Sequence, residues 1–60
     1  MNRFDELKTL VDGSEADFSK FQDGNSAAGT RVRKVMLELR NLANTIRKEV
    51  QEEKNRRKAS

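Results

Sequence analysis

The fold of this 60-residue chain is decided by residues 21–28, Phe21-Gln22-Asp23-Gly24-Asn25-Ser26-Ala27-Ala28, which carry its one strong turn signal. Glycine adopts a positive φ without a steric penalty, and the side-chain oxygen of Asn25 or Ser26 can cap the start of a helix. We therefore expect a turn at residues 23–25, between a first helix at about 2–22 and a second at about 26–54.

The residues before the turn predict a helix with one apolar stripe. Its members recur at steps of three and four: Phe4, Leu7, Val11, Phe18 and Phe21. This spacing places them on one side of a helix. Ser14 interrupts the stripe, and Asp12-Gly13 before it resembles a helix stop followed by a new N-cap. We expect a continuous helix, with a bend or break at Gly13-Ser14 as the alternative.

The residues after the turn predict a longer helix with a broad apolar face. Its larger members are Val32, Val35, Met36, Leu39, Leu42 and Ile46. A face of this width needs more than one neighbouring helix. The expected fold is all-α, a single antiparallel helical hairpin over residues 1–60 that oligomerises into a helical bundle. The longer second helix overhangs the first, with the pairs Lys48/Glu52, Glu52/Arg56 and Glu53/Arg57 supporting it and residues 55–60 frayed.

The composition indicates a core too thin for a stable monomer. Only 33% of the residues are apolar, three are Phe, and there is no Trp or Tyr. A chain this short buries little surface, and without Cys or His it has neither disulfides nor a structural zinc site. We therefore expect a homo-oligomer, with a dimer of hairpins forming a four-helix bundle.

Several classes of function are disfavoured by the same composition. The chain has no His, Cys or Tyr, and its carboxylates are scattered over solvated helical faces, so we expect no catalysis, metal site, cofactor or small-molecule substrate. No apolar run approaches the ~20 residues of a membrane span, and the first residues do not resemble a signal peptide. We therefore expect no membrane contact and a cytoplasmic location.

Charge is distributed unevenly along the chain. Residues 1–30 hold three basic and six acidic residues, a net of −3, whereas residues 31–60 hold ten basic and four acidic residues, a net of +6. One set of cations, Arg33, Arg40, Arg47 and Lys54, recurs at steps of seven along an edge of the apolar face. These could bind phosphates, or they could cover the apolar seam and pair with the acids of the first helix. Those acids are Asp5, Glu6, Asp12, Glu15 and Asp17.

Gly29 is unusual because it lies in the first turns of the second helix. Glycine there costs about 1 kcal/mol relative to alanine. Its presence suggests that another backbone comes close, although an ordinary glycine at a helix start is the alternative.

A more specific pattern runs through residues 24–48. It consists of Gly24-Asn25-Ser26-Ala27-Ala28-Gly29-Thr30-Arg31-Val32-Arg33-Lys34, then Leu37-Glu38-Leu39, then Ile46-Arg47-Lys48. This pattern resembles the bacterial linker-histone-like family, which includes the chlamydial nucleoid-condensing histone-like proteins. The chlamydial members continue into a long Lys/Ala-rich tail, whereas this sequence has no such tail, so it resembles a short form.

The resemblance implies DNA binding without sequence specificity, and compaction or bridging of DNA in the nucleoid. Affinity would come from contacts of Lys and Arg with phosphates. The residues expected to make them are Arg31, Arg33, Lys34, Arg40, Arg47, Lys48, Lys54, Arg56, Arg57 and Lys58. The alternative is a helical protein-interaction or scaffolding module without a role in nucleic-acid binding.

Overall fold

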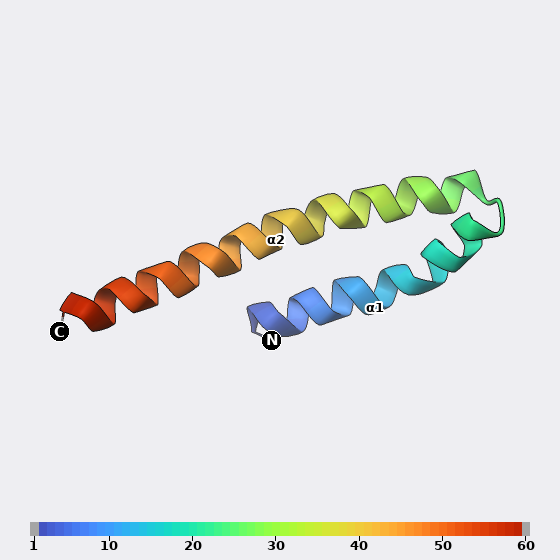
Figure 1. Cartoon of the computed structure of the whole chain (residues 1–60). Coiled ribbons are helices and arrows are strands. Elements are labelled where there is room, and N and C mark those ends of the chain that lie inside the picture. Colours follow the sequence, from blue (N-terminus) through green and yellow to red (C-terminus); the bar gives the residue numbers. More distant parts are fainter. Residues whose placement is uncertain (1, 60) are drawn as a thin grey trace.

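Two antiparallel helices form the whole of the described structure. The computed structural model describes residues 2–59, with Ala59 described only by its backbone. Helix α1 spans Arg3–Gln22 and helix α2 spans Ser26–Ala59. The two helices lie side by side and are joined by a tight turn (Figure 1). The predicted all-α hairpin is therefore confirmed, and residues 2–59 contain no strand.

Helix α1 begins at a capped end and runs without a break. The Asn2 side chain accepts a hydrogen bond of 2.8 Å from the backbone N–H of Asp5, which satisfies one of the free donors at the helix start. Acidic residues in the first turn also oppose the positive end of the helix dipole. Gly13 stays within the helix, and the buried Ser14 hydroxyl donates to the carbonyl of Val11 at 2.9 Å. The helix therefore has no break at Gly13-Ser14.

The turn ends α1 with a glycine in the left-handed region. Gly24 has a φ of 103°. Its N–H donates to the carbonyl of Phe21 at 2.9 Å, and the N–H of Asn25 donates to that of Lys20 at 3.0 Å. These two bonds form a Schellman motif, which satisfies the last carbonyls of a helix and reverses the chain. The Asn25 side chain then accepts from the N–H of Ala28 at 3.0 Å and caps α2.

Helix α2 is longer than the sequence predicts. It continues to Ala59, whereas the apolar periodicity placed its end near Lys54 with frayed residues beyond. The physical reason is an ion-pair cluster, because Glu53 accepts from both Arg56 and Arg57, the latter at 3.1 Å. Pairs at these spacings support helix. Arg56 thus pairs with Glu53 rather than with the expected Glu52, and Ser60 lies outside the described residues.

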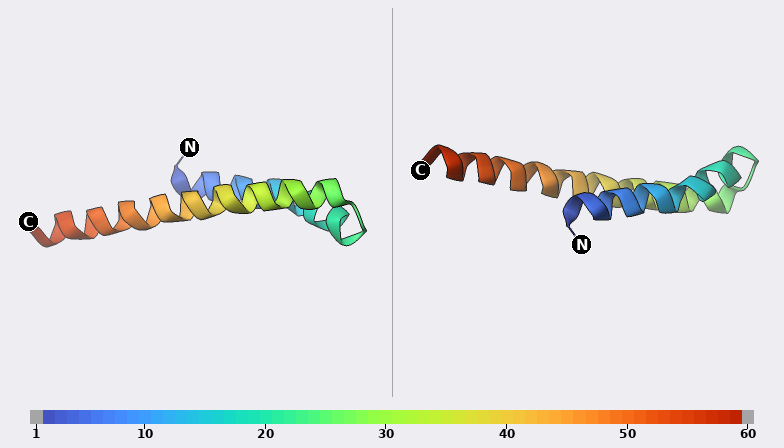
Figure 2. Two further views of the ribbon diagram at one scale, coloured as in Figure 1. Left: turned by 90° about the horizontal axis from the view of Figure 1, so that it is seen from above. Right: turned by 90° about the horizontal axis from the view of Figure 1, so that it is seen from below.

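The contact between the helices is thin and the molecule is elongated. Ala28 is the only fully buried apolar residue among those described, and no large side chain among them is fully buried. The molecule measures 54 × 17 × 13 Å and its radius of gyration is 15.6 Å, compared with about 10 Å for a compact domain of this length. Two further views show α2 extending well past the start of α1 (Figure 2). The C-terminal turns of α2 therefore stand free of α1.

Candidate nucleic-acid interface

The two sides of the hairpin differ in chemistry. One side, the polar face, carries the two ion pairs that join the helices. Arg31 contacts Asp17 near the turn at 3.0 Å, and Arg3 contacts Glu49 near the open end at 3.3 Å. All four of these side chains remain at least partly exposed, so each pair contributes modestly to stability. Together the pairs fasten both ends of α1 to α2.

Asp17 has a shifted ionisation because of its arginine partner. The hydrogen bond from the Arg31 side chain, of 3.0 Å from Nε, holds the pKa of Asp17 below its ordinary value of 3.8, and the positive charges of Arg31 and Lys20 act in the same direction. Desolvation opposes this shift only in part. Asp17 is therefore an anion at neutral pH, and it neutralises one of the cations of α2.

The cations at steps of seven form an exposed row along α2, which we call the cationic stripe. Its members are Arg33, Arg40, Arg47 and Lys54. All four are exposed, and none makes an ion pair within the described part of the chain. The alternative that the acids of α1 pair with this stripe is not seen within the single hairpin. Of those acids, Asp17 alone bonds a cation of α2, and that cation is Arg31.

The other predicted cations lie elsewhere around α2. Lys34 and Lys48 are exposed away from the stripe, and no ion pair to a described residue holds either of them. Arg56 and Arg57 are exposed at the free end, where both reach Glu53, and Lys58 is exposed beside them. Cations therefore surround the side of α2 that α1 leaves open.

The predicted apolar residues divide into two groups. The half-buried group lies between the helices: Leu7, Val32, Val35, Leu39, Leu42 and Ile46. The exposed group consists of Phe4, Val11, Phe18, Phe21 and Met36. Sequence periodicity assigned both groups to one core or oligomer surface, and in the single hairpin only the first group is covered.

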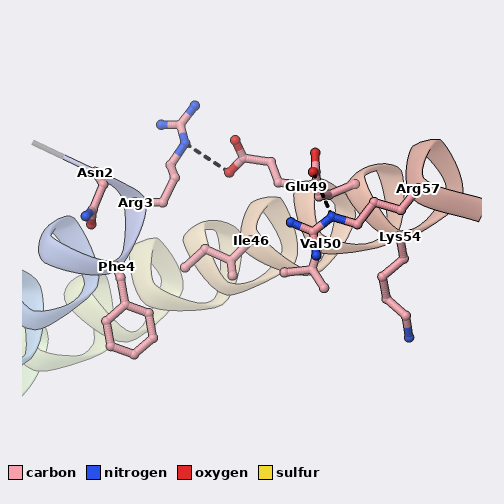
Figure 3. Close-up of a pocket in the computed structure, with 9 residues that line it drawn as sticks. Asn2, Arg3, Phe4, Ile46, Glu49, Val50, Lys54 and Arg57 are labelled. Carbon is pink, nitrogen blue, oxygen red and sulfur yellow. Dashed lines mark hydrogen bonds and ion pairs between the residues drawn. The ribbon is translucent and has the colours of Figure 1, made fainter. Parts of the chain in front are cut away.

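The exposed apolar residues of both helices meet on one face. Phe4 of α1 lines a hollow with Ile46 and Val50 of α2, and Arg3 and Glu49 line the same hollow. The close-up in Figure 3 shows the Phe4 ring and the Lys54 side chain on one side of the helices and the Arg3–Glu49 pair on the other. Near the turn, Phe18 shares a second hollow with Gly29 and members of α2. We call this side of the hairpin the apolar face.

Gly29 has a structural role that differs in part from the one expected. A β-carbon added at Gly29 would lie 2.6 Å from Cδ1 and 2.9 Å from Cε1 of Phe21. The neighbour that approaches is thus the ring of Phe21 rather than a second backbone. Sequence spacing alone could not identify it, because Phe21 lies in the other helix and its position depends on the turn between them.

The described residues lack two features that would indicate other functions. No group of three or more His, Cys, Asp or Glu side chains among them is placed to hold a metal ion. Within the same residues, neither helix has an apolar stretch of the length that crossing a membrane requires.

Comparison with known proteins identifies one family. The model of the family described as "Histone H1-like protein Hc1" matches residues 1–56. No curated protein and no solved structure matches the chain. The match covers nearly the whole hairpin, including the first helix, whereas the sequence pattern described above covered only residues 24–48.

Proposed function

Because the chain belongs to the histone H1-like Hc1 family, a family of DNA-binding nucleoid proteins, we propose that α2 binds the phosphate backbone of duplex DNA without reading its sequence. By holding neighbouring duplexes or segments, the protein compacts or bridges DNA in the nucleoid. This proposal rests mainly on the exposed cations of α2 that have no acidic partner among the described residues.

The charges of α2 suit a phosphate backbone. The seven cations without an ion pair to a described residue are Arg33, Lys34, Arg40, Arg47, Lys48, Lys54 and Lys58. Arg31, Arg56 and Arg57 add charge that their carboxylate partners only partly offset, and all three are exposed. Because each guanidinium has five N–H donors, an arginine that binds one carboxylate still has donors for a phosphate.

The shape of α2 supports contact along a duplex rather than insertion into a pocket. A 34-residue helix is about 51 Å long, which is about one and a half turns of B-DNA. Cations lie on more than one side of its exposed surface, which supports contacts with two duplexes as well as with one. The cationic residues of α2 are interleaved with no aromatic side chain, so stacking on unpaired bases is disfavoured.

The proposal is tested by measuring affinity for duplex DNA at several salt concentrations. With about 4 to 6 phosphate contacts per chain, log affinity against log salt should have a slope of roughly −4 to −5. Two duplexes of unrelated sequence should bind equally well, and RNA of equal length serves as a comparison. Affinity that ignores salt, or no binding at low salt, would contradict the proposal and favour a protein-scaffolding role.

A further inference from the structure

The hairpin exposes more surface than a compact monomer of its mass, and the apolar face is part of that surface. The chain exposes 5125 Å², whereas a folded monomer of 6.9 kDa exposes about 4,000 Å². This excess of about 1,100 Å² belongs to the whole elongated hairpin, including the free turns of α2. It is large enough to include an interface of ordinary size, in which each partner buries ~800 Å². Phe4, Val11 and Phe18 are each roughly half exposed, at 58%, 50% and 48%.

The exposed apolar residues also have the spacing of a helical bundle. In α1 they recur at steps of seven: Phe4, Val11 and Phe18. In α2 a matching row at the same step contains Gly29, Met36, Ala43 and Val50. Combined with the half-buried residues, each helix has an apolar arc wide enough for two neighbouring helices, which is the pattern of a four-helix bundle. One hairpin supplies only one such neighbour.

From these observations we infer that the apolar face is covered by a second copy of this chain, stacked so that α1 of each copy lies along α2 of the other. This inference does not depend on the proposed binding of DNA. A second copy fits because the face is built from the same two rows on both partners, and a twofold axis makes such a surface complementary to itself.

Two copies can stack their apolar faces in two ways, depending on the direction of the twofold axis. The arrangement of charges favours the stack in which α1 of each copy lies along α2 of the other. On the α2 border of the apolar face stand Arg33, Arg40 and Arg47 of the cationic stripe. On the α1 border stand Asp12 and Glu15, and Lys8 precedes them on the same border. If the twofold axis runs parallel to the helices, the acids of α1 face the stripe of the second copy. If the axis crosses the helices, α2 faces α2 and the two stripes repel each other.

The positions of the residues along the helix axis, here called their levels, agree with a twofold axis parallel to the helices. Phe18 lies level with Gly29 and Arg33, with which it lines a hollow, and Phe4 lies level with Val50. An axis parallel to the helices preserves these levels between the two copies. Each Phe18 ring then meets the space beside Gly29 of the second copy, and Glu15 lies between the levels of its Arg33 and Arg40.

This dimer has a consequence for the free end of α2. Both copies of α2 run in the same direction, so their free C-terminal turns leave the bundle from the same end. The dimer therefore carries two cationic helical ends side by side, whereas the other stack would place them at opposite ends.

The first test compares two glutamate variants by sedimentation over a range of concentrations, without DNA. Val11→Glu places a charge in the proposed interface and should raise the dimer dissociation constant at least about a hundredfold. Ala16→Glu is the matched control, because Ala16 lies on the same helix, exposed and nearly half a turn away from Val11. Its dissociation constant should stay within about threefold of the parent. A parent chain that is monomeric at ~100 μM, or a Val11→Glu variant that dimerises like the parent, would overturn the inference.

The second test measures the arrangement and remains informative if Val11→Glu does not fold. Because the described chain has no cysteine, an Asn55→Cys variant can carry a single spin label near the free end of each α2. Pulsed electron spin resonance should give a distance of about 15–30 Å between the labels, as expected for helices in one bundle. A distance of about 50 Å, which follows if the free ends point in opposite directions, would overturn the pairing of α1 with α2.

Discussion

Helices α1 and α2 share one packing surface but present opposite charges to solvent. Both contribute half-buried apolar residues to the seam and both expose a second apolar row on the same face. Outside that face, α1 carries five acidic and three basic residues and α2 carries four acidic and ten basic residues. The apolar pattern thus determines how the two helices pack together, whereas the charge pattern makes α2 the helix that we propose to meet an anionic partner.

The largest effect is expected from truncation of the shared seam. Leu39→Ala should lower the free energy of unfolding by about 2 kcal/mol, the lower end of the range for buried leucines, because Leu39 is only half-buried. Urea denaturation at one fixed chain concentration measures it, since the stability of an oligomer depends on concentration. Leu37→Ala is the control, because Leu37 is 51% exposed and should cost less than about 0.5 kcal/mol. Equal losses in the two variants would show that Leu39 does not pack in the seam.

The next effect separates the two helices by their role in binding DNA. Lys34→Gln combined with Lys48→Gln removes two cations of α2, and Lys8→Gln combined with Lys20→Gln removes two from α1, with the same change in net charge. The salt slope should become shallower by about 2 for the α2 variant, because each lost phosphate contact removes about 0.9. The α1 variant should change it little. A similar change in both would mean that only total charge matters.

Replacing the glycine within each helix by alanine compares how the two positions affect stability. Gly13→Ala in α1 meets open space and should stabilise the protein by about 0.5–1 kcal/mol, because alanine favours helix. Gly29→Ala in α2 should be at least about 1 kcal/mol less stable than Gly13→Ala, because its β-carbon collides with the ring of Phe21. Thermal melting of the two variants side by side gives the difference. If both stabilise equally, the ring of Phe21 does not restrict Gly29.

The smallest effect concerns the ion pair that links the helices near the turn. Arg31→Gln should raise the pKa of Asp17 toward its ordinary value of 3.8, and an NMR titration of the Asp17 carboxyl carbon measures this. Arg33→Gln is the control, because Arg33 makes no ion pair within the described chain.

The pH dependence of this pair has a definite sign. The folded-state pKa is depressed, so the stability that the pair contributes is present above pH 3.8 and is lost as pH falls through the lower folded-state value. The difference in stability between the parent and Arg31→Gln should therefore shrink below about pH 3.8. A difference that grows on acidification would contradict the assignment.

The fold could be predicted largely from the sequence because its signals are local. Asp23-Gly24-Asn25 sets the turn, and apolar residues at steps of three and four on either side define two helices. The end of α2 was missed because apolar periodicity stops near Val50, while the helix beyond it is supported by the contacts of Glu53 with Arg56 and Arg57. The Asn2 cap was also missed, although an asparagine three residues before Asp5 is a recognisable signal.

The candidate interface could be predicted only in outline. Composition and spacing identified the cations of α2, but they could not show which acids these cations reach. That depends on how far each helix is rotated about its axis, and in the structure this rotation buries the small residues Ser14 and Ala28. For the same reason the sequence could not divide the apolar residues into a half-buried seam and an exposed face.

Whether α2 rather than α1 binds the DNA backbone can be measured by NMR, by mapping the contacts of a short duplex onto the protein. Backbone amide shifts of the 15N-labelled full chain are followed as the duplex is added at low salt. We expect the largest changes on α2, around Lys34, Lys48 and residues 54–58, with α1 nearly unchanged and with reversal of the changes at high salt. Shifts that centre on α1, or that persist at high salt, would contradict it.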